Sequence, residues 1–334
     1  MIRVRHRLIL LLLLLGAAAT LAVTPWVGDH ALGWDVLGRP FGTDLEAVIF
    51  WKIRVPRVLL AFLAGVGLSL GGVVFQAMFR NPLATPFTLG VAGGSAFGVA
   101  LWVHLGVAIS ILGISGISLA ALLGAALAIL LLYGVARATG RMSPMTMLLG
   151  GVAISFIFSS LILLLQYLMD AGNTFRVIHW LMGDMGRADA AAVLQILPFV
   201  GTGSLIVYFL RNELNLLAIS DDLAASRGVG VESVRTVLFL AVSLMIAGVI
   251  SVCGPIGFVG IMAPHVCRLI VGANHRVLIP SAALFGGLFL TLCDTLAHNM
   301  FDSASVPVGV ITALLGGPFF LWLLFRRGAG SLQE

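Results

Sequence analysis

Charge and cysteine are both scarce in this chain of 334 residues. Asp, Glu, Lys and Arg together make up 10% of the sequence, whereas hydrophobic residues make up 60% and the mean hydropathy is +1.11. A soluble domain carries about 25% charged residues, so the composition excludes that class and indicates a membrane protein. The three cysteines, Cys253, Cys267 and Cys293, lie in apolar segments without the paired spacing of a metal site. We therefore expect buried thiols and no bound metal.

Motifs for catalysis are also missing. The sequence contains no nucleophile elbow, phosphate loop, His-Glu-x-x-His pair or dinucleotide fingerprint. We therefore expect that the chain is not an enzyme and binds no cofactor itself. The formal net charge of +5 does not indicate a nucleic-acid partner, because the basic residues fall at predicted helix ends, where they set membrane topology.

Apolar runs of membrane length fill most of the chain. A spanning helix needs about 20 mostly apolar residues. The sequence predicts an all-α polytopic domain over residues 1–334 with ten spans: 8–27, 57–79, 86–106, 114–138, 144–169, 189–210, 233–253, 257–271, 277–298 and 307–325. The first run follows three arginines and has the layout of a secretory signal, but its length and the spans after it favour an uncleaved helix.

Glycine and proline mark how the second span packs and ends. Gly65, Gly67, Gly71 and Gly72 favour close approach of neighbouring helices, which a lone anchor in lipid does not need. The steps Asn81-Pro82 and Thr85-Pro86 then predict a break before the third span.

The basic residues also predict an orientation. With the N-terminus in the cytoplasm, thirteen of the 19 Lys and Arg residues lie at cytoplasmic helix ends, and most acids outside the bilayer lie on the outer side. An even number of spans then places both termini in the cytoplasm.

Two connections are predicted to form short helices of their own. The outer one, within about 174–183, is amphipathic from Phe175 to Met182 and ends at Gly183. The inner connection, 212–232, predicts a helix that Ser220 caps, with two aspartates in the first turn and Gly228 after the last.

Polar side chains inside a bilayer are costly and are therefore candidates for functional sites. Gln76 serves either such a site or an interhelical hydrogen bond. Asp294 and His298 lie four residues apart and therefore share a helix face. The pair is interpreted either as a proton relay, as a metal pair or as a local hydrogen-bonded pair. His265 and Arg268 either line a gate or satisfy backbone carbonyls. The fifth span carries a polar stripe that is either a water-lined path or a set of serines bonded to their own helix, namely Ser155, Ser159, Ser160 and Gln166.

Three blocks of sequence resemble the permease subunits of binding-protein-dependent ABC importers for iron-siderophore complexes, haem and vitamin B12 (cobalamin). The blocks are residues 54–90, 254–276 and 307–319, and they carry Arg54, Arg57, Gln76, Asn81 and Pro82, then Pro264, His265 and Arg268, and last the run from Thr312 to Phe319.

The resemblance implies a ten-helix permease, like that of the vitamin B12 importer, in the inner membrane of a prokaryote. It implies a homodimer with two cytoplasmic ATPase subunits, which hold ATP and Mg²⁺, and a periplasmic or extracellular substrate-binding protein. The substrate would pass between the fifth and tenth helices, and which chelate it is stays open. The alternative is a secondary transporter or channel without an ATPase, which would need mid-span charges. Asp294, the one candidate, lies near a helix end.

The resemblance also assigns roles to residues. Those expected to dock the binding protein are Arg54, Arg57 and, on the outer helix, Arg176. Those expected to couple to the ATPase are Asp221, Asp222, Ala224, Arg227 and Gly228. Those expected at the path and its gate loop, Met142–Thr146, are Pro144, Met145, Ser155, Ser159 and Gln166. The chain departs from the family pattern at Ser220 (usually Gly), Arg227 (usually Leu), His298 (often Arg), Ser305-Val306 (usually Glu-Leu) and Asn274 (usually Asp).

Overall fold

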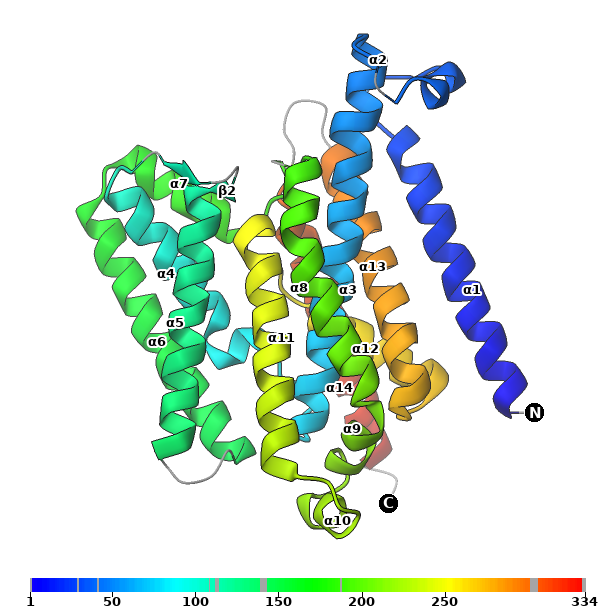
Figure 1. Cartoon of the computed structure of the whole chain (residues 1–334), viewed down its shortest axis with the longest axis vertical. Coiled ribbons are helices and arrows are strands. Elements are labelled where there is room, and N and C mark those ends of the chain that lie inside the picture. The colour runs from blue at the N-terminus through cyan, green and yellow to red at the C-terminus, as the bar shows by residue number, and fades with distance from the viewer. Residues whose placement is uncertain are drawn as a thin grey trace.

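Ten helices of the computed structural model correspond one to one to the ten predicted spans (Figure 1). They are α1 (Ile2–Val23), α3 (Val55–Met78), α4 (Val91–His104), α5 (Gly116–Ala138), α6 (Pro144–Leu168), α8 (Ala190–Phe209), α11 (Val231–Cys253), α12 (Val259–Val271), α13 (His275–Asn299) and α14 (Val308–Ser331). The structure describes residues 2–28, 30–40, 42–107, 109–111, 114–138, 143–186, 188–300 and 306–331. Within these residues seven helices are long and apolar enough to cross a membrane. The chain is a multi-pass, all-α membrane protein.

The shorter elements cap the two ends of this bundle. They are the 3₁₀ turns Thr24–Trp26, Trp34–Gly38 and Pro86–Leu89, the π-helical turn Val48–Arg54, the helices α2 (Leu45–Ala47), α7 (Ala171–Leu181), α9 (Arg211–Leu217) and α10 (Asp221–Ser226), and the antiparallel strands β1 (Ser110–Ile111) and β2 (Ile114–Ser115). In Figure 1, α2 and α7 lie at one end, whereas α10 lies at the other, where α1 begins and α14 ends. We call the first end outer and the second inner.

Several predicted boundaries are wrong: α1 begins at Ile2 rather than 8, α14 ends at Ser331 rather than 325, and three further differences have a local cause. The third span begins at Val91 rather than 86, because Thr85 caps a separate 3₁₀ turn and Gly90 follows it with φ +83°. The predicted outer loop 28–56 is partly helical, since a continuous helical run from Leu45 leads into α3.

The outer amphipathic helix is the third of these corrections. It starts earlier than predicted, at Ala171, because Asp170 caps it by accepting a hydrogen bond from the Asn173 amide at 3.0 Å. This bond lowers the pKa of Asp170. The helix stops before Gly183, as predicted, and that glycine has φ +72°.

The centre of the bundle is α3, which packs against α8, α11, α12 and α13. Its glycines make these contacts possible. A Cβ on Gly72 would overlap the carbonyl oxygen of Gly260, and a Cβ on Gly65 would overlap that of Gly286. The predicted close approach of helices around the second span is therefore confirmed.

Candidate functional site

The three sequence blocks meet where α3, α12 and α14 come together. The Gln76 side chain of α3 donates to the Gly260 carbonyl at 3.3 Å and accepts from Arg268 Nη2 of α12 at 2.6 Å. Of the two roles considered for Gln76, the interhelical hydrogen bond is therefore present. Buried His265 of α12 lies edge-on to Phe319 of α14, with 6.2 Å between ring centroids.

The break between α11 and α12 is the most unusual backbone in this region. Five residues connect Cys253 to Val259 without helical structure, and Phe258 has φ +66°. A positive φ is uncommon for a bulky residue and persists only where the surroundings enforce it. The Phe258 ring covers Gly316 of α14, where a Cβ would come within 2.3 Å of the ring.

This break runs from the α7–α8 connection at the outer end, where the Asp184 amide donates to the Cys253 carbonyl, to a point deep in the bundle. Gly260 abuts Gly72, which is 17 residues along α3 from Val55, or roughly 25 Å at the rise of an α-helix. Non-helical backbone at such depth is tolerated only where protein buries it or where it lines a cavity.

Two adjoining cavities border this break. One of about 610 Å³ lies between the break and the outer half of α14, and one of about 200 Å³ lies beside α3. They share Phe87, Gly257 and Phe258, and most of the remaining lining is apolar. Phe87 belongs to the 3₁₀ turn Pro86–Leu89, in the break between α3 and α4. The two breaks therefore face one another across an apolar space.

The path residues predicted on α6 lie elsewhere. None of the five is among the residues that line these two cavities. Pro144 is the first residue of α6, directly after the N-cap Ser143, and Met145 is 65% exposed. Ser155 donates to the Gly151 carbonyl at 2.8 Å, so this serine bonds to its own helix.

The rest of the polar stripe and the gate loop stay predictions. Ser159 is exposed and Gln166 is half-buried. Met142, the first residue of the predicted gate loop, lies outside the described residues.

At the outer end, Arg57 joins α3 to α13. Its Nε and Nη2 donate to the two carboxylate oxygens of Asp294 at 2.8 and 2.9 Å, and Nη1 lies 3.3 Å from His298 Nδ1. Asp294 and His298 therefore share a face, as predicted, and Arg57 contacts both of them. Arg54 donates to the carbonyls of Pro25 and His30.

At the inner end, Asp221 joins three elements. Its Oδ1 accepts from Arg80 Nη2 at 3.0 Å and from Arg235 Nη2 at 2.9 Å. Arg80 follows α3, has φ +49° and points to α10, while Arg235 is a buried residue of α11. The Asp221 carboxylate thus fixes α10 to the inner ends of two central helices.

The residues predicted to couple to an ATPase divide into two groups. Asp222, Arg227 and Gly228 are exposed. Ala224 is fully buried and Asp221 is bound as above, so these two face the permease itself. Ser220 caps the helix through the Leu223 amide at 3.0 Å, and Gly228 has φ +80°, as predicted.

Asn81 and Pro82, from the first of the three sequence blocks, lie in the turn after α3. Asn81 Oδ1 accepts from the Leu83 amide at 2.9 Å, and Pro82 is exposed. Pro264 lies buried inside α12.

The sequence reasoning missed Phe87 and Phe258, because an aromatic residue in an apolar run has no distinguishing signal. It interpreted Arg80 and Arg235 only as topology signals, although their places at helix ends beside the capped inner segment could have indicated partners for its aspartates.

Comparison with known proteins agrees with this architecture. The model of the FecCD transport family matches residues 8–326. The chain is 33% identical to the hemin transport system permease of Yersinia pestis, with 97% of each chain covered. It is 37% identical to the cobalamin import system permease of Halobacterium salinarum, over 92% of this chain and 83% of that protein. A solved structure described as an inward-facing metal-chelate type ABC transporter superimposes with a TM-score of 0.85 at 31% identity, over 95% of this chain and 99% of the other.

Proposed function

Because the chain belongs to the FecCD transport family, we propose that it is the permease subunit of an ABC importer and that its cargo is a metal chelate. The cargo class includes iron-siderophore complexes, haem and cobalamin. We propose that residues 1–334 form one permease domain with both termini in the cytoplasm. The permease holds no ATPase site of its own, and ATP hydrolysis in partner subunits drives the transport.

The observation that carries this proposal is the pair of facing breaks around Phe87 and Phe258. An apolar cavity of about 610 Å³ lies in the range typical of small-molecule pockets. Its apolar wall offers few hydrogen bonds to a cargo, which suits passage, because a path must bind weakly enough to release. Specificity would then come mainly from the binding protein.

The inner end supports a partner ATPase. The short helix α10 projects at that end (Figure 1) and exposes Asp222, Arg227 and Gly228. A secondary transporter would have no evident use for a helix that is capped, tied to α3 and α11 through Asp221, and presented to the cytoplasm. We propose that these exposed residues contact the ATPase and that Asp221 transmits its movement.

Exposed apolar side chains on the outer half of α14 and all along α6 support a homodimer. On α6, Phe156, Leu163 and Tyr167 are exposed, with Tyr167 at 86%. On α14, Leu314 lines the large cavity and is 64% exposed. A second copy across a two-fold axis would close the cavity on its open side and bring Met145 and Ser159 toward the path.

The test is ATP-driven uptake by proteoliposomes that contain the permease with its cognate ATPase and binding protein. Cobalamin, haem and a ferric hydroxamate are offered separately, with ATP or a non-hydrolysable analogue inside the vesicles. We expect uptake of one chelate that requires ATP, the ATPase and the binding protein. Uptake without the ATPase would overturn the importer mechanism, and failure of all three cargoes in an assembled, ATP-hydrolysing complex would overturn the cargo class.

A further inference from the structure

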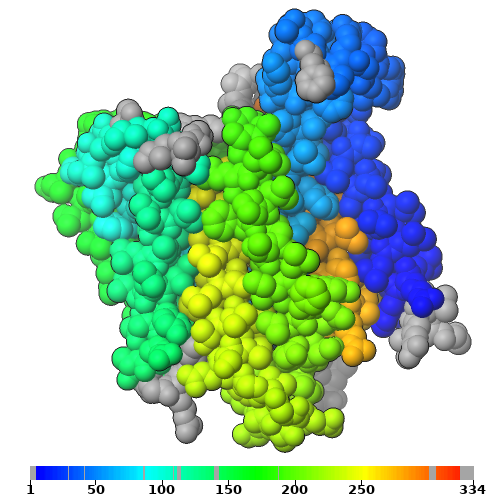
Figure 2. All heavy atoms as spheres, in the orientation of Figure 1, coloured from blue at the N-terminus to red at the C-terminus, as the bar shows by residue number. Residues whose placement is uncertain are grey.

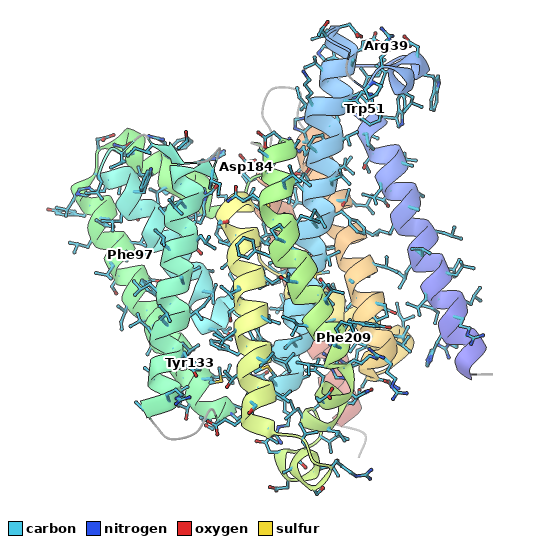
Figure 3. The ribbon with its side chains drawn as sticks, in the orientation of Figure 1. Arg39, Trp51, Phe97, Tyr133, Asp184 and Phe209 are labelled. Atoms are coloured by element: carbon cyan, nitrogen blue, oxygen red, sulfur yellow. The ribbon has the colours of Figure 1, made fainter. Side chains whose placement is uncertain are left out.

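A second cavity, remote from the two breaks, opens at the outer end of the bundle. It has a volume of about 490 Å³. Residues of α4, α5, α7, α8 and α11 line it, together with Asp184 of the α7–α8 connection, which Figure 3 labels. It shares no lining residue with the cavities around Phe258, so the proposed path does not account for it.

The wall of this cavity carries both signs of charge. The lining includes the guanidinium of Arg176, the imidazole of His179, and the carboxylates of Asp184 and Asp189. The carboxylates are held in place, because Asp184 Oδ1 accepts from the Gly186 amide at 2.9 Å and Asp189 Oδ1 accepts from the Ala192 amide at 2.7 Å. A purely anionic ligand would face two carboxylates, and a purely cationic one would face a guanidinium. A zwitterion matches both signs of charge.

The remaining lining suits an amphiphile at the membrane surface. Val99, Val103 and Val252 form apolar walls, while Gln195 offers an amide. Trp180, which also lines the cavity, belongs to a residue type enriched at the headgroup level of bilayers.

An apolar stripe leads away from the cavity along α11. Ser251 lines the cavity, and Leu244 and Val237 follow at seven-residue spacing on the same helix face, both exposed. On either side α5 and α8 pack against α11 but hardly touch one another. Figure 2 shows α11, in yellow, between them on the face toward the viewer. The stripe has the position and polarity of a track for a lipid chain.

We propose that this cavity binds the headgroup of a zwitterionic glycerophospholipid of the aminoethyl phosphate class. The phosphate accepts from Arg176 and the Gln195 amide, and the ammonium donates to Asp184 and Asp189. One acyl chain lies over Leu244 and Val237. The bound lipid connects α7, which directly follows the predicted path helix α6, to α8 and α11.

The test is lipid binding by the full-length permease, purified without a binding protein and stripped of lipid. Retention of phosphatidylethanolamine, phosphatidylcholine and phosphatidylglycerol with identical chains is measured by native mass spectrometry. Soluble glycerophosphoethanolamine serves as the competitor without chains. We expect phosphatidylethanolamine to bind about fivefold more tightly than the other two, because only its ammonium retains N–H donors for the carboxylates.

Matched variants locate the site. Asp189→Asn retains an N-cap for α8 but removes one charge, and we expect it and Arg176→Gln each to weaken phosphatidylethanolamine binding about fivefold. Asp44→Asn makes the same change at the N-cap of α2, outside the cavity, and should leave binding unchanged. Equal retention of the three lipids, equal effects of Asp189→Asn and Asp44→Asn, or competition by the soluble headgroup at equal concentration would each overturn the proposal.

Discussion

Arg57 and Asp294, which are 237 residues apart, form a bidentate ion pair that joins α3 to α13. Their side chains are 15% and 6% exposed. Fork-to-fork pairing of this kind is strong and geometrically specific. Arg57 therefore has a structural task at the outer end, in addition to the docking role that the family resemblance implies for it.

We predict that Asp294→Ala lowers the free energy of unfolding by about 3–5 kcal/mol, because it leaves a largely buried guanidinium without its carboxylate. Chemical unfolding of the detergent-purified permease measures this change. Asp35→Ala is the control, since the Asp35–Arg39 pair is exposed at 64% and 43% and such pairs contribute about 0–1 kcal/mol. Equal effects of the two substitutions would contradict the prediction.

Arg54 is the better residue for testing binding-protein docking. Its bonds to the Pro25 and His30 carbonyls position it at the outer end, and unlike Arg57 it does not join α3 to α13 through the Asp294 pair. We expect Arg54→Glu to weaken binding-protein affinity at least about tenfold, because a charged rim contact becomes repulsive.

Surface plasmon resonance with the assembled permease and ATPase measures this affinity. Lys52→Glu makes the same charge change two residues away and separates specific docking from the general potential of the surface. Unchanged affinity in Arg54→Glu, or an equal loss in both variants, would remove the assignment.

The Asp221 carboxylate gives a prediction about coupling. Asp221→Asn weakens both arginine contacts, one of which is to Arg235, a side chain only 5% exposed. We expect faster hydrogen exchange in α10 and α9 and an uptake per ATP hydrolysed that falls about tenfold.

Asp222→Asn is the matched variant, since this neighbouring aspartate is exposed. It should leave hydrogen exchange in α10 unchanged. If both variants exchange alike, Asp221 does not fix the helix.

The order of helices could be predicted from the sequence, because apolar length and basic flanks report directly on membrane spans. The caps at Ser220 and Gly228 could be predicted as well, since each depends only on neighbouring residues. The capping of α7 by Asp170 was missed, because the amphipathic pattern begins four residues after the helix does.

The site was less predictable, because its contacts join residues far apart in the chain. Nothing local distinguishes Arg57 as the partner of Asp294, or Phe258 as the residue that covers Gly316. The resemblance identified the blocks that contain these residues but not which side chains within them touch. The proposed path residues on α6 depend on a second copy of the chain and stay predictions.

The contact between Phe258 and Gly316 gives the most direct test of the path. We predict that Gly316→Ala reduces chelate uptake about tenfold, because its Cβ would come within 2.3–2.5 Å of Phe258 atoms. The break can hardly yield, since the Phe258 carbonyl already accepts from Ile261 and Met262 at the start of α12. Gly317→Ala is the control, as a Cβ there meets nothing within 4 Å among the residues that the structure describes.

A double-mutant cycle separates this contact from a general loss of stability. Phe258→Ala removes the ring that a Cβ on Gly316 would overlap, so the Gly316→Ala substitution should cost far less uptake in that background than in the natural chain. Overpacking alone costs about 1–3 kcal/mol, and unfolding measurements on all four proteins show whether uptake falls beyond what stability explains. Additive effects on uptake would mean that Phe258 does not act through Gly316. A loss in Gly317→Ala equal to that in Gly316→Ala would move the important contact from the break to the neighbouring face of α14, where the second copy is expected.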